Sequence, residues 1–451
     1  MSGTPSHITR GWVWRQSWPV ALANALGPMV GFVDTLILGR FAGVSALAGI
    51  GLGAAIYGIV YWGFGFLRMS TAGLAAQSDG AGDERAVQAH IRRAVPLGLA
   101  IGATVLLLQT LLIPLILGLY TAGSGIEAEA ATYLRARLWG LPATLGGIAL
   151  MGWFVGLGEA RRAFQLQLVL NLVNVALSLL FVVQFGWGLW GVGIASAIAE
   201  WAGFAAGLWL AATLATRRGG RQRFTRKELL EPSAVRGLMG TNTNIFIRTA
   251  SMVVGFNFFA NAAAGEGEVF LAGNHILMQF VTIVALVLDA YAHTAEAAAG
   301  SAYGAKDRAR FDRAVRVTAE FSVVSALALS LIIYLGGGVV IDLMTTEAAV
   351  RASAKAFLPY CALTPVLGFA AWHLDGIFIG VTATRAMRNA GVVSLLLYLG
   401  IHYLLEPRFG PHGIWVAFLA YYVVRALTLA VAFPSLRRNL GQTQHSVVIQ
   451  P

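Results

Sequence analysis

Several acidic residues lie within stretches of the sequence that are otherwise strongly apolar. They are Asp34, Glu200, Asp289 and Asp375, and Glu296 follows Asp289 by seven residues, two turns along one helix face. A charge at the centre of a bilayer costs at least about 2.5–3.5 kcal/mol. An embedded carboxyl can exchange its proton for a cation or for a conformational state. We therefore take these acids as the candidate functional residues, with Asp34 first among them. Glu296 lies near the end of its helix and is more readily a structural carboxylate that faces an arginine or water.

The surroundings of Asp34 favour a functional role over a structural one. Gly27 and Gly31 lie on its own helix face, where a neighbouring helix or a ligand can approach. Pro19 and Pro28 each remove a backbone hydrogen bond from the same helix. A helix that can bend near an ionisable residue is a candidate switch.

A polar stripe follows in the fifth apolar segment. Asn171, Asn174 and Ser178 are spaced so that they share one face of an otherwise apolar helix. Such residues often join helices inside membranes, and this reading stays open. If the stripe faces Asp34, its oxygens and the carboxylate would form a site for a proton or a hard cation. Glu200, one turn after Ser196, is equally open to a role as a hydrogen-bond partner between helices.

The composition defines the class of protein that holds these residues. The chain has 451 residues, of which 57% are hydrophobic and 12% are charged, with a mean hydropathy of +0.70. Soluble domains carry about 25% charge, so a soluble enzyme and a disordered chain are excluded. A single cysteine, Cys361, excludes an intrachain disulfide and a cysteine-based metal cluster.

Apolar segments near the roughly 20 residues that span a bilayer recur along almost the whole chain. They predict an all-α integral membrane protein with about twelve transmembrane helices. The expected spans are 16–38, 46–72, 94–120, 131–157, 163–184, 188–215, 241–262, 269–298, 317–345, 355–381, 389–405 and 411–436.

Basic residues gather in connections on one side of these spans, most densely in Arg217–Arg236 and Lys306–Arg316. By the positive-inside rule this side is cytoplasmic, and an even number of spans places both termini there. The net charge of +11 is then an orientation signal, with anionic lipid headgroups as its partner in place of nucleic acid. We expect a multi-pass protein of the cell inner membrane.

The sequence repeats itself at an offset of 224 residues. Val30-Gly31-Phe32 corresponds to Val254-Gly255-Phe256, and Phe154 and Gly156 correspond to Phe378 and Gly380. A repeat of six helices keeps its orientation in the membrane, as in the parallel repeats of secondary transporters. This predicts an N-lobe at 1–215, a cytoplasmic linker at 216–240 with a flexible point at Gly219 and Gly220, and a C-lobe at 241–451.

The chain resembles the multidrug and toxic compound extrusion (MATE) transporters, and within them the DinF branch. The resemblance covers nearly the whole chain, and several blocks carry it: Val33-Asp34-Thr35, Leu288-Asp289, Leu374-Asp375-Gly376, Phe378-Ile379-Gly380 and Met387-Arg388-Asn389. It implies two six-helix lobes that form a V-shaped cavity, and export of cationic or amphipathic compounds in exchange for H+ or Na+.

The resemblance also implies residue roles. The coupling site of such transporters would hold Asp34, Asn174 and Ser196, and bending of the first helix would map to Pro19. The family's second aspartate, four residues after the asparagine, is replaced by Ser178. This departure favours a proton on Asp34 alone over a two-acid Na+ site. The family's aspartate in the tenth helix matches Asp375.

Proton-coupled export of organic cations is therefore the leading functional hypothesis. No cofactor is expected, the partners are lipids and small-molecule substrates, and the chain is expected to be monomeric. Absence of a GxxxxGK[ST] motif excludes ATP-driven transport by this chain alone. Flipping or export of a lipid or lipid-linked precursor is an alternative, disfavoured by the expectation that embedded charges are mostly acidic. An intramembrane enzyme is a minor alternative, since no paired catalytic residues are recognisable.

Overall fold

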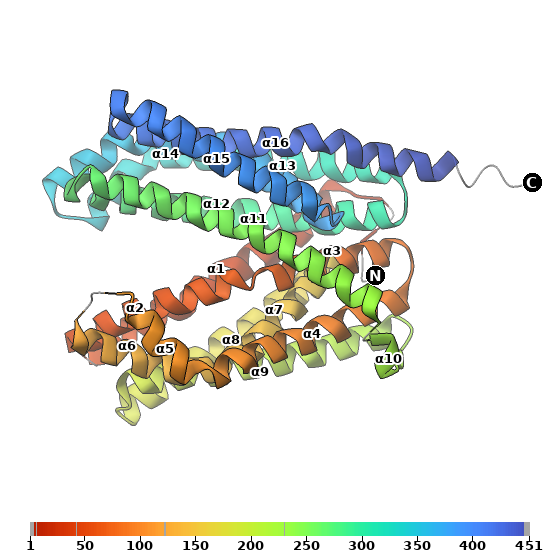
Figure 1. The fold of residues 1–451 in the computed structure, drawn as a ribbon, viewed down its shortest axis with the longest axis horizontal. Coiled ribbons are helices and arrows are strands. Elements are labelled where there is room, and N and C mark those ends of the chain that lie inside the picture. Colours follow the sequence, from red (N-terminus) through yellow and green to blue (C-terminus); the bar gives the residue numbers. More distant parts are fainter. Residues whose placement is uncertain (1–3, 6, 42, 121–122, 230, 446–451) are drawn as a thin grey trace, which may run out of the picture. The chain divides into compact units, whose positions relative to one another are not determined.

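The computed structural model describes residues 4–5, 7–41, 43–120, 123–229 and 231–445, and it describes the backbone alone at 28, 39–41, 43–47, 233–235 and 441–445. Every regular element in these ranges is helical (Figure 1). Twelve helical spans among them are long and apolar enough to cross a membrane. The all-helical membrane fold and the number of spans are thus confirmed. Eleven of the twelve described spans are longer than expected, because many helices continue into charged ends. The third, expected at 94–120, is shorter and lies at Glu84–Leu107, because the helix is interrupted at Leu108.

The described chain separates into two compact units. The first comprises Trp18–Asp79 and Asp83–Leu238, and the second comprises Thr4–Ser17, Gly80–Gly82 and the chain from Met239 on. The first helix, α1 (Arg10–Phe41), belongs to the second unit up to Ser17 and to the first unit from Trp18.

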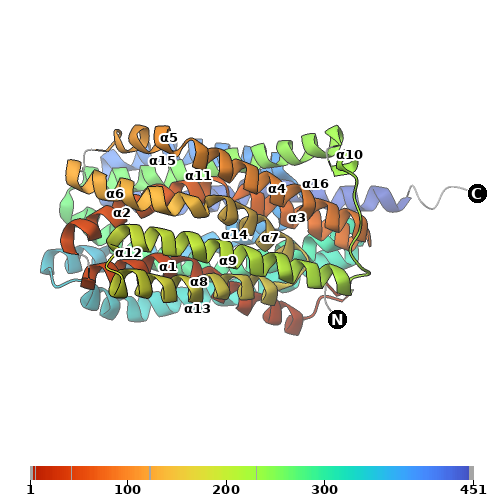
Figure 2. The same ribbon diagram turned by 90° about the horizontal axis from the view of Figure 1, so that it is seen from below.

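The remaining helices of the first unit include several that are interrupted. Leu138–Gly140 forms a 3₁₀ turn, and Pro142 then stands in the first turn of a new helix, where its missing N–H has no intrahelical partner to lose. In Figure 2, α8 and α9 lie side by side. The elements are α2 (Gly43–Gly63), α3 (Phe66–Gly80), α4 (Glu84–Leu107), α5 (Gln109–Leu117), α6 (Ser124–Arg137), η1 (Leu138–Gly140), α7 (Leu141–Gly156), α8 (Ala160–Leu179), the π-helix η2 (Leu180–Gln184), α9 (Gly188–Arg217) and α10 (Arg226–Leu229).

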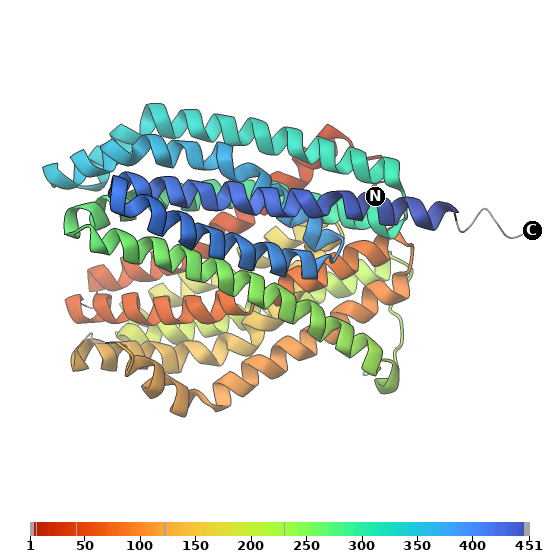
Figure 3. The same ribbon diagram turned by 45° about the horizontal axis from the view of Figure 1, so that its top comes forward.

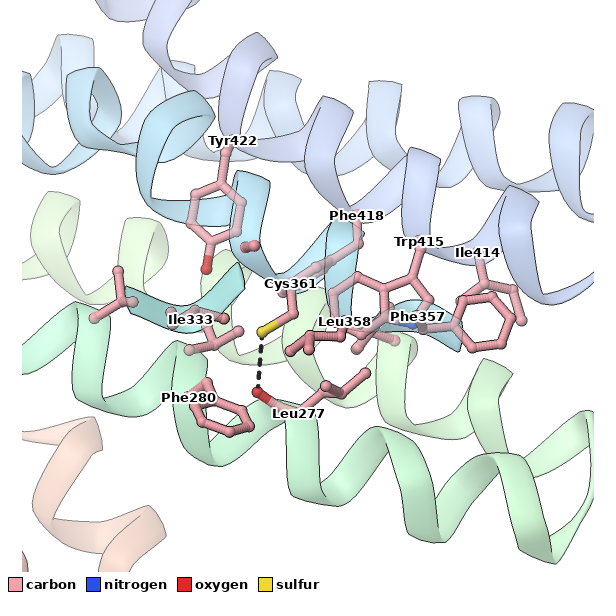
Figure 4. Close-up of a cluster of buried hydrophobic side chains, with 14 of the residues drawn as sticks. Leu277, Phe280, Ile333, Phe357, Leu358, Cys361, Ile414, Trp415, Phe418 and Tyr422 are labelled. Atoms are coloured by element: carbon pink, nitrogen blue, oxygen red, sulfur yellow. Dashed lines mark hydrogen bonds between the residues drawn. The ribbon is translucent and has the colours of Figure 1, made fainter. Parts of the chain in front are cut away.

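The second unit consists of long helices, and α15 and α16, drawn in blue in Figure 3, pack along each other. Cys361 lies in its apolar core, where the thiol donates to the carbonyl oxygen of Leu277 at 3.4 Å, close to Phe280 and Phe418 (Figure 4). The helices are α11 (Pro232–Gly265), α12 (Glu268–Gly304), α13 (Arg308–Met344), α14 (Ala348–Gly380), α15 (Thr384–Phe409) and α16 (Pro411–His445).

Large apolar side chains remain exposed on the outside of the helices, as a lipid-facing surface requires. On α13, Leu327, Leu331 and Leu335 recur every fourth residue and are 54%, 58% and 70% exposed. A stripe of leucines along one helix face has no favourable place in water, but it is compatible with lipid chains.

Paired glycines let two helices cross closely in each unit. A Cβ atom on Gly152 or Gly156 of α7 would lie 2.2 Å from a backbone carbonyl oxygen of α3, that of Arg68 or Ala72. A Cβ atom on Gly376 or Gly380 of α14 would likewise lie 2.2 Å from a backbone carbonyl oxygen of α12. These glycines are 224 positions apart in the two units, so the sequence repeat reproduces one helix crossing of the small-xxx-small type.

The repeat also reproduces a helix cap. Asp83 accepts a hydrogen bond from the backbone N–H of Ala86 at 2.8 Å, at the beginning of α4. Asp307, 224 positions later, accepts one from the N–H of Arg310 at 2.9 Å, at the beginning of α13. A capping aspartate satisfies a backbone donor that has no partner within the helix.

The first part of the predicted linker is held against the first unit. Arg218 pairs with Asp79 and with Glu84, and Gln88 donates to the carbonyl of Gly220 at 3.0 Å. Gly219 and Gly220 have φ of +102° and +94°, a conformation that favours glycine. These glycines therefore belong to a fixed turn, where we expected a flexible point.

Glu228 holds the end of this linker segment against Arg85 of α4. Its carboxylate accepts hydrogen bonds from the backbone N–H of Thr225 at 2.7 Å and from Arg85 at 2.6 Å, and these bonds lower the pKa of Glu228 to about 2. The stabilisation is therefore complete above about pH 4.5 and is lost only as the pH falls toward 2. Docking of the linker is consequently constant over the physiological pH range.

We predict that Gly152→Ala and Gly376→Ala each lower the free energy of unfolding by about 1–3 kcal/mol, because the methyl group must displace a backbone carbonyl. Thermal melting in detergent measures the change. Gly147→Ala, in α7 as well but with no atom within 4 Å of its Cβ, is the matched control and should not destabilise. Equal melting of Gly152→Ala and Gly147→Ala would contradict the tight crossing.

We also predict that Glu228→Gln releases the linker. The amide loses the charge that holds Arg85 and weakens the bond to Thr225. Trypsin should then cleave after Arg221, Arg223 or Lys227 several times faster. Mass spectrometry of the fragments measures the rate of cleavage. Glu231→Gln, three residues further on, is the control, and an unchanged cleavage rate in Glu228→Gln would show that this carboxylate does not hold the segment.

Candidate functional site

The first unit brings the predicted polar residues together around Asp34. Asp34 of α1 is 1% exposed, and Ser178 and Asn174 of α8 and Ser196 of α9 are equally buried. Ser178 Oγ donates to Asp34 Oδ1 at 2.9 Å, and Ser196 Oγ donates to Oδ2 at 3.1 Å. Asn174 Nδ2 in turn donates to Ser196 Oγ at 2.8 Å.

Three helices therefore meet at one carboxylate. Asn174 and Ser178 are four residues apart on α8, so they present their side chains from successive turns of one face. Because both carboxylate oxygens accept a hydroxyl hydrogen, this arrangement suits the ionised form of Asp34. Asn174 Oδ1 is buried and accepts no hydrogen bond from the residues that the structure describes.

Two further predicted residues lie on the helices of this network without joining it by a described bond. Asn171, 6% exposed, donates its amide to the carbonyl of Gln167 one turn earlier on α8 at 2.8 Å. Pro19 is buried in α1, two residues after the point where that helix passes from one unit to the other. Pro28, the second proline of α1, has a side chain outside the described ones.

Glu200 belongs to a second buried group in the same unit. Arg137 Nη2 of α6 pairs with Glu200 Oε1 at 2.7 Å, and the hydroxyl of Tyr57 donates to the same carboxylate at 3.1 Å. Tyr57 also shares a hydrogen bond of 3.0 Å with Thr144. The Arg137 guanidinium lies 4.4 Å from the centre of the Tyr57 ring, within the range of a cation–π interaction.

In the second unit, Asp375 of α14 is buried between two arginines. Arg248 of α11 and Arg425 of α16 both bind Asp375 Oδ2. All three residues are 6% exposed or less. Asp289 of α12 is partly buried and interacts electrostatically with both arginines. Glu296, two turns further along α12, is fully buried.

The repeat does not reproduce the Asp34 network in the second unit. The positions 224 residues after Asp34, Asn174 and Ser178 are Phe258, Tyr398 and His402. These three form an aromatic group, in which the Phe258 ring centre lies 5.7 Å from that of Tyr398 and 4.7 Å from that of His402. Corresponding positions thus meet in both units, but they form a carboxylate site in the first unit and an apolar contact in the second.

A family model described as MatE matches residues 19–180 and 245–404. The chain belongs to the MATE family. DNA damage-inducible protein F of Escherichia coli (strain K12) is 30% identical over 431 residues, which cover 95% of this chain and 92% of that protein. A probable multidrug resistance protein NorM of Aromatoleum aromaticum is 27% identical over 372 residues, 79% of this chain and 78% of that protein.

The fold agrees with the family. The structure of the Vibrio cholerae MATE transporter VcmN in the bent form has a TM-score of 0.87 and 19% identity, with coverage of 96% of this chain and 98% of that chain. MATE proteins are multi-pass membrane transporters of small molecules and are not enzymes, so the intramembrane-enzyme alternative is excluded. The described residues contain no group of three or more His, Cys, Asp or Glu side chains that could hold a metal ion.

Three buried arginines of this MATE protein are not among the residues predicted from the sequence. Arg137, Arg248 and Arg425 are 3–8% exposed, so among the described residues the four buried acids, Asp34, Glu200, Glu296 and Asp375, outnumber the buried arginines by only one. An arginine within an apolar segment is as costly as an aspartate, and this was the signal available in the sequence. Each arginine is tolerated because a carboxylate lies beside it: Glu200 for the first and Asp375 for the other two.

We predict that Asp375→Leu destabilises the protein by about 3–5 kcal/mol, because it leaves two buried guanidinium groups without their shared carboxylate. The triple variant Arg248→Met, Asp375→Leu, Arg425→Met removes all three charges and should melt closer to the wild type. Thermal melting in detergent compares them. A triple variant less stable than Asp375→Leu would show that the arginines have other essential partners.

Proposed function

We propose that this MATE protein exports organic cations or amphipathic compounds by antiport with protons, and that Asp34 carries the proton. The observation that carries the proposal is a buried, hydroxyl-bonded carboxylate on α1, placed between α8 and α9. The protonation of a buried carboxylate depends strongly on the positions of the donors and charges around it.

Protonation would rearrange the hydrogen bonds of Asp34. The ionised carboxylate accepts from Ser178 and from Ser196. Once a proton occupies one oxygen, that oxygen becomes a donor and the serine facing it must turn its own hydrogen elsewhere. The unpaired Oδ1 of Asn174 is a buried acceptor in the same network. Uptake of a proton would therefore loosen the contacts of α1 with α8 and α9.

α1 offers a place where such a change can act. The backbone hydrogen bonds of α1 lack one donor at Pro19, because proline has no N–H. The helix changes from one compact unit to the other between Ser17 and Trp18, directly before that proline. Bending of α1 near Pro19 would connect protonation of Asp34 with exposure of the substrate site. We also propose that Asn171 acts in the coupling site, and that Asp289, Asp375 and Glu296 act in the substrate cavity or its gate.

The donor set favours H+ over Na+. Both oxygens of Asp34 receive hydrogens from hydroxyl groups, whereas a bound Na+ would need these oxygens and the serine oxygens turned toward itself. Replacement of a second acid by Ser178 leaves a single negative charge to balance a cation. A proton satisfies one carboxylate without further ligands.

The remaining expectations belong to the same proposal. Basic connections such as Arg217–Arg236 favour the cell inner membrane with both termini in the cytoplasm and anionic lipid headgroups beside them. We propose that the protein acts as a monomer.

Transport of an anionic lipid or lipid-linked precursor is the second candidate. The buried pair Arg248 and Arg425 favours it, because two guanidinium groups share one carboxylate oxygen in the second unit. Asp289, which also acts on both arginines, opposes an additional anion there. We therefore rank it below cation export.

We predict that proteoliposomes take up a fluorescent organic cation when a pH gradient is imposed and not when only a Na+ gradient is imposed. In Asp34→Asn the uptake should fall to that of protein-free liposomes, because the amide cannot carry a proton. Ser178→Ala should keep part of the rate. Asp312→Asn, which removes a partly exposed partner of Arg437, is the control and should transport normally.

Wild-type rates in Asp34→Asn would contradict the coupling assignment. Uptake driven by a Na+ gradient alone would show that Na+, and not H+, is the coupling ion. If neither gradient moves a cation but a labelled anionic lipid crosses the bilayer, the second candidate is correct.

A further inference from the structure

The side chain of Arg137 is buried in the first unit and is held there by two partners. Glu200 binds Nη2 at 2.7 Å, the Tyr57 ring lies 4.4 Å from the guanidinium carbon, and the residue is 8% exposed. The Tyr57 hydroxyl donates to Glu200 and shares a hydrogen bond with Thr144, so the partners of Arg137 are themselves held. A guanidinium fixed in this way is a cation of defined position inside the bilayer.

This cation lies beside the carboxylate that we propose as the proton carrier. Ser196, which donates to Asp34, and Glu200, which binds Arg137, are four residues apart on α9 and so occupy successive turns of one face. Arg137 is close enough to Asp34 for the two charges to interact. In a medium of low dielectric constant, such an interaction is much stronger than in water.

The described partners of Arg137 do not bind all of its donor atoms. Its Nε and Nη1 atoms are buried and donate no hydrogen bond to the described residues. A guanidinium needed only to neutralise Glu200 would gain most from a bidentate pair, whereas this one keeps a single described bond to the carboxylate. Much of its positive charge thus remains available to act on neighbouring groups.

Among the described groups around Asp34, Arg137 supplies the positive charge. α8 contributes Asn174 and Ser178, which carry no charge, and α9 contributes Ser196 and the anionic Glu200. The tyrosines Tyr57 and Tyr133, from α2 and α6, also interact with this group of charges. Their phenols are neutral near pH 7. Among the side chains that the structure describes, Arg137 and Glu200 therefore set the charge balance at Asp34.

We propose that Arg137, held by Glu200 and Tyr57, is a positioning residue that sets the proton affinity of Asp34. The inference rests on the proposed function, because it concerns the group assigned there as the proton carrier. Arg137 stabilises the ionised carboxylate, and Glu200 limits that effect by neutralising part of the cation. Removing either partner should therefore shift the protonation of Asp34, but in opposite directions.

The test measures protonation of Asp34 directly. A lipid-soluble carbodiimide modifies protonated carboxyl groups, and mass spectrometry of the peptide containing Asp34 gives the modified fraction at each pH. Arg137→Met should move the midpoint to higher pH by about one unit, a tenfold gain in proton affinity. Glu200→Gln should move it to lower pH, since the cation is no longer neutralised. Arg137→Lys retains the charge and should stay near the wild-type midpoint.

The double variant Arg137→Met, Glu200→Gln keeps the experiment decisive if Arg137→Met fails to fold. It leaves no unpaired buried charge, and its comparison with Glu200→Gln isolates the cation. The midpoint of the double variant should lie at higher pH than that of Glu200→Gln. Midpoints that stay within a few tenths of a pH unit, or that shift the same way in Arg137→Met and Glu200→Gln, would overturn the proposal and leave Arg137 a structural ion pair.

Transport separates this inference from the proposed function. The pH dependence of cation uptake should follow the modification midpoints in each variant. If the midpoints shift as expected but no variant, nor the wild type, shows proton-driven uptake, the proposed function fails and the electrostatic control of Asp34 stands. If the wild type transports with protons and the midpoints do not move, the role of Arg137 is refuted alone.

Discussion

Every charge that this chain places inside the bilayer must find its partner within a helix bundle. Water cannot solvate a buried guanidinium or carboxylate there, and an unpaired charge would cost several kcal/mol. The structure meets this requirement with small closed groups: Arg137 with Glu200, and Arg248 and Arg425 with Asp375. Asp34 differs from these groups, because the described partners of its carboxylate are neutral hydroxyl groups and not a directly bonded cation.

This difference is the basis for proposing a reversible proton site at Asp34 and permanent ion pairs in the other groups. A carboxylate bonded directly to an arginine has little reason to accept a proton near neutral pH. A carboxylate bonded to Ser178 and Ser196 can accept one by the rotation of a hydroxyl group. Arg137 of α6 is bound to Glu200, one turn along α9 from Ser196, and has no described bond to Asp34. We propose that this placement keeps Asp34 ionisable while still adjusting its proton affinity.

The two units use one backbone scaffold for different interiors. The glycine crossings at Gly152 and Gly376 and the caps at Asp83 and Asp307 recur at the same offset. The polar groups do not recur. Where the first unit has Arg137, the second has Cys361, buried in an apolar core (Figure 4). Packing requirements thus preserve the crossings, while the interior side chains are free to specialise in one unit.

The sequence by itself determined the membrane class, the twelve spans, the repeat and the most important acid, because hydropathy and periodicity are local properties. It also placed Asn174, Ser178 and Ser196 correctly beside Asp34, through the helical spacing and the family resemblance. Only the tertiary structure decided the partners of Glu200 and Asp375. Arg137 lies 63 positions before Glu200, and Arg248 lies 127 before Asp375, so no local pattern joins them. Which buried charge meets which depends on how the helices pack, and that packing is a property of the folded chain.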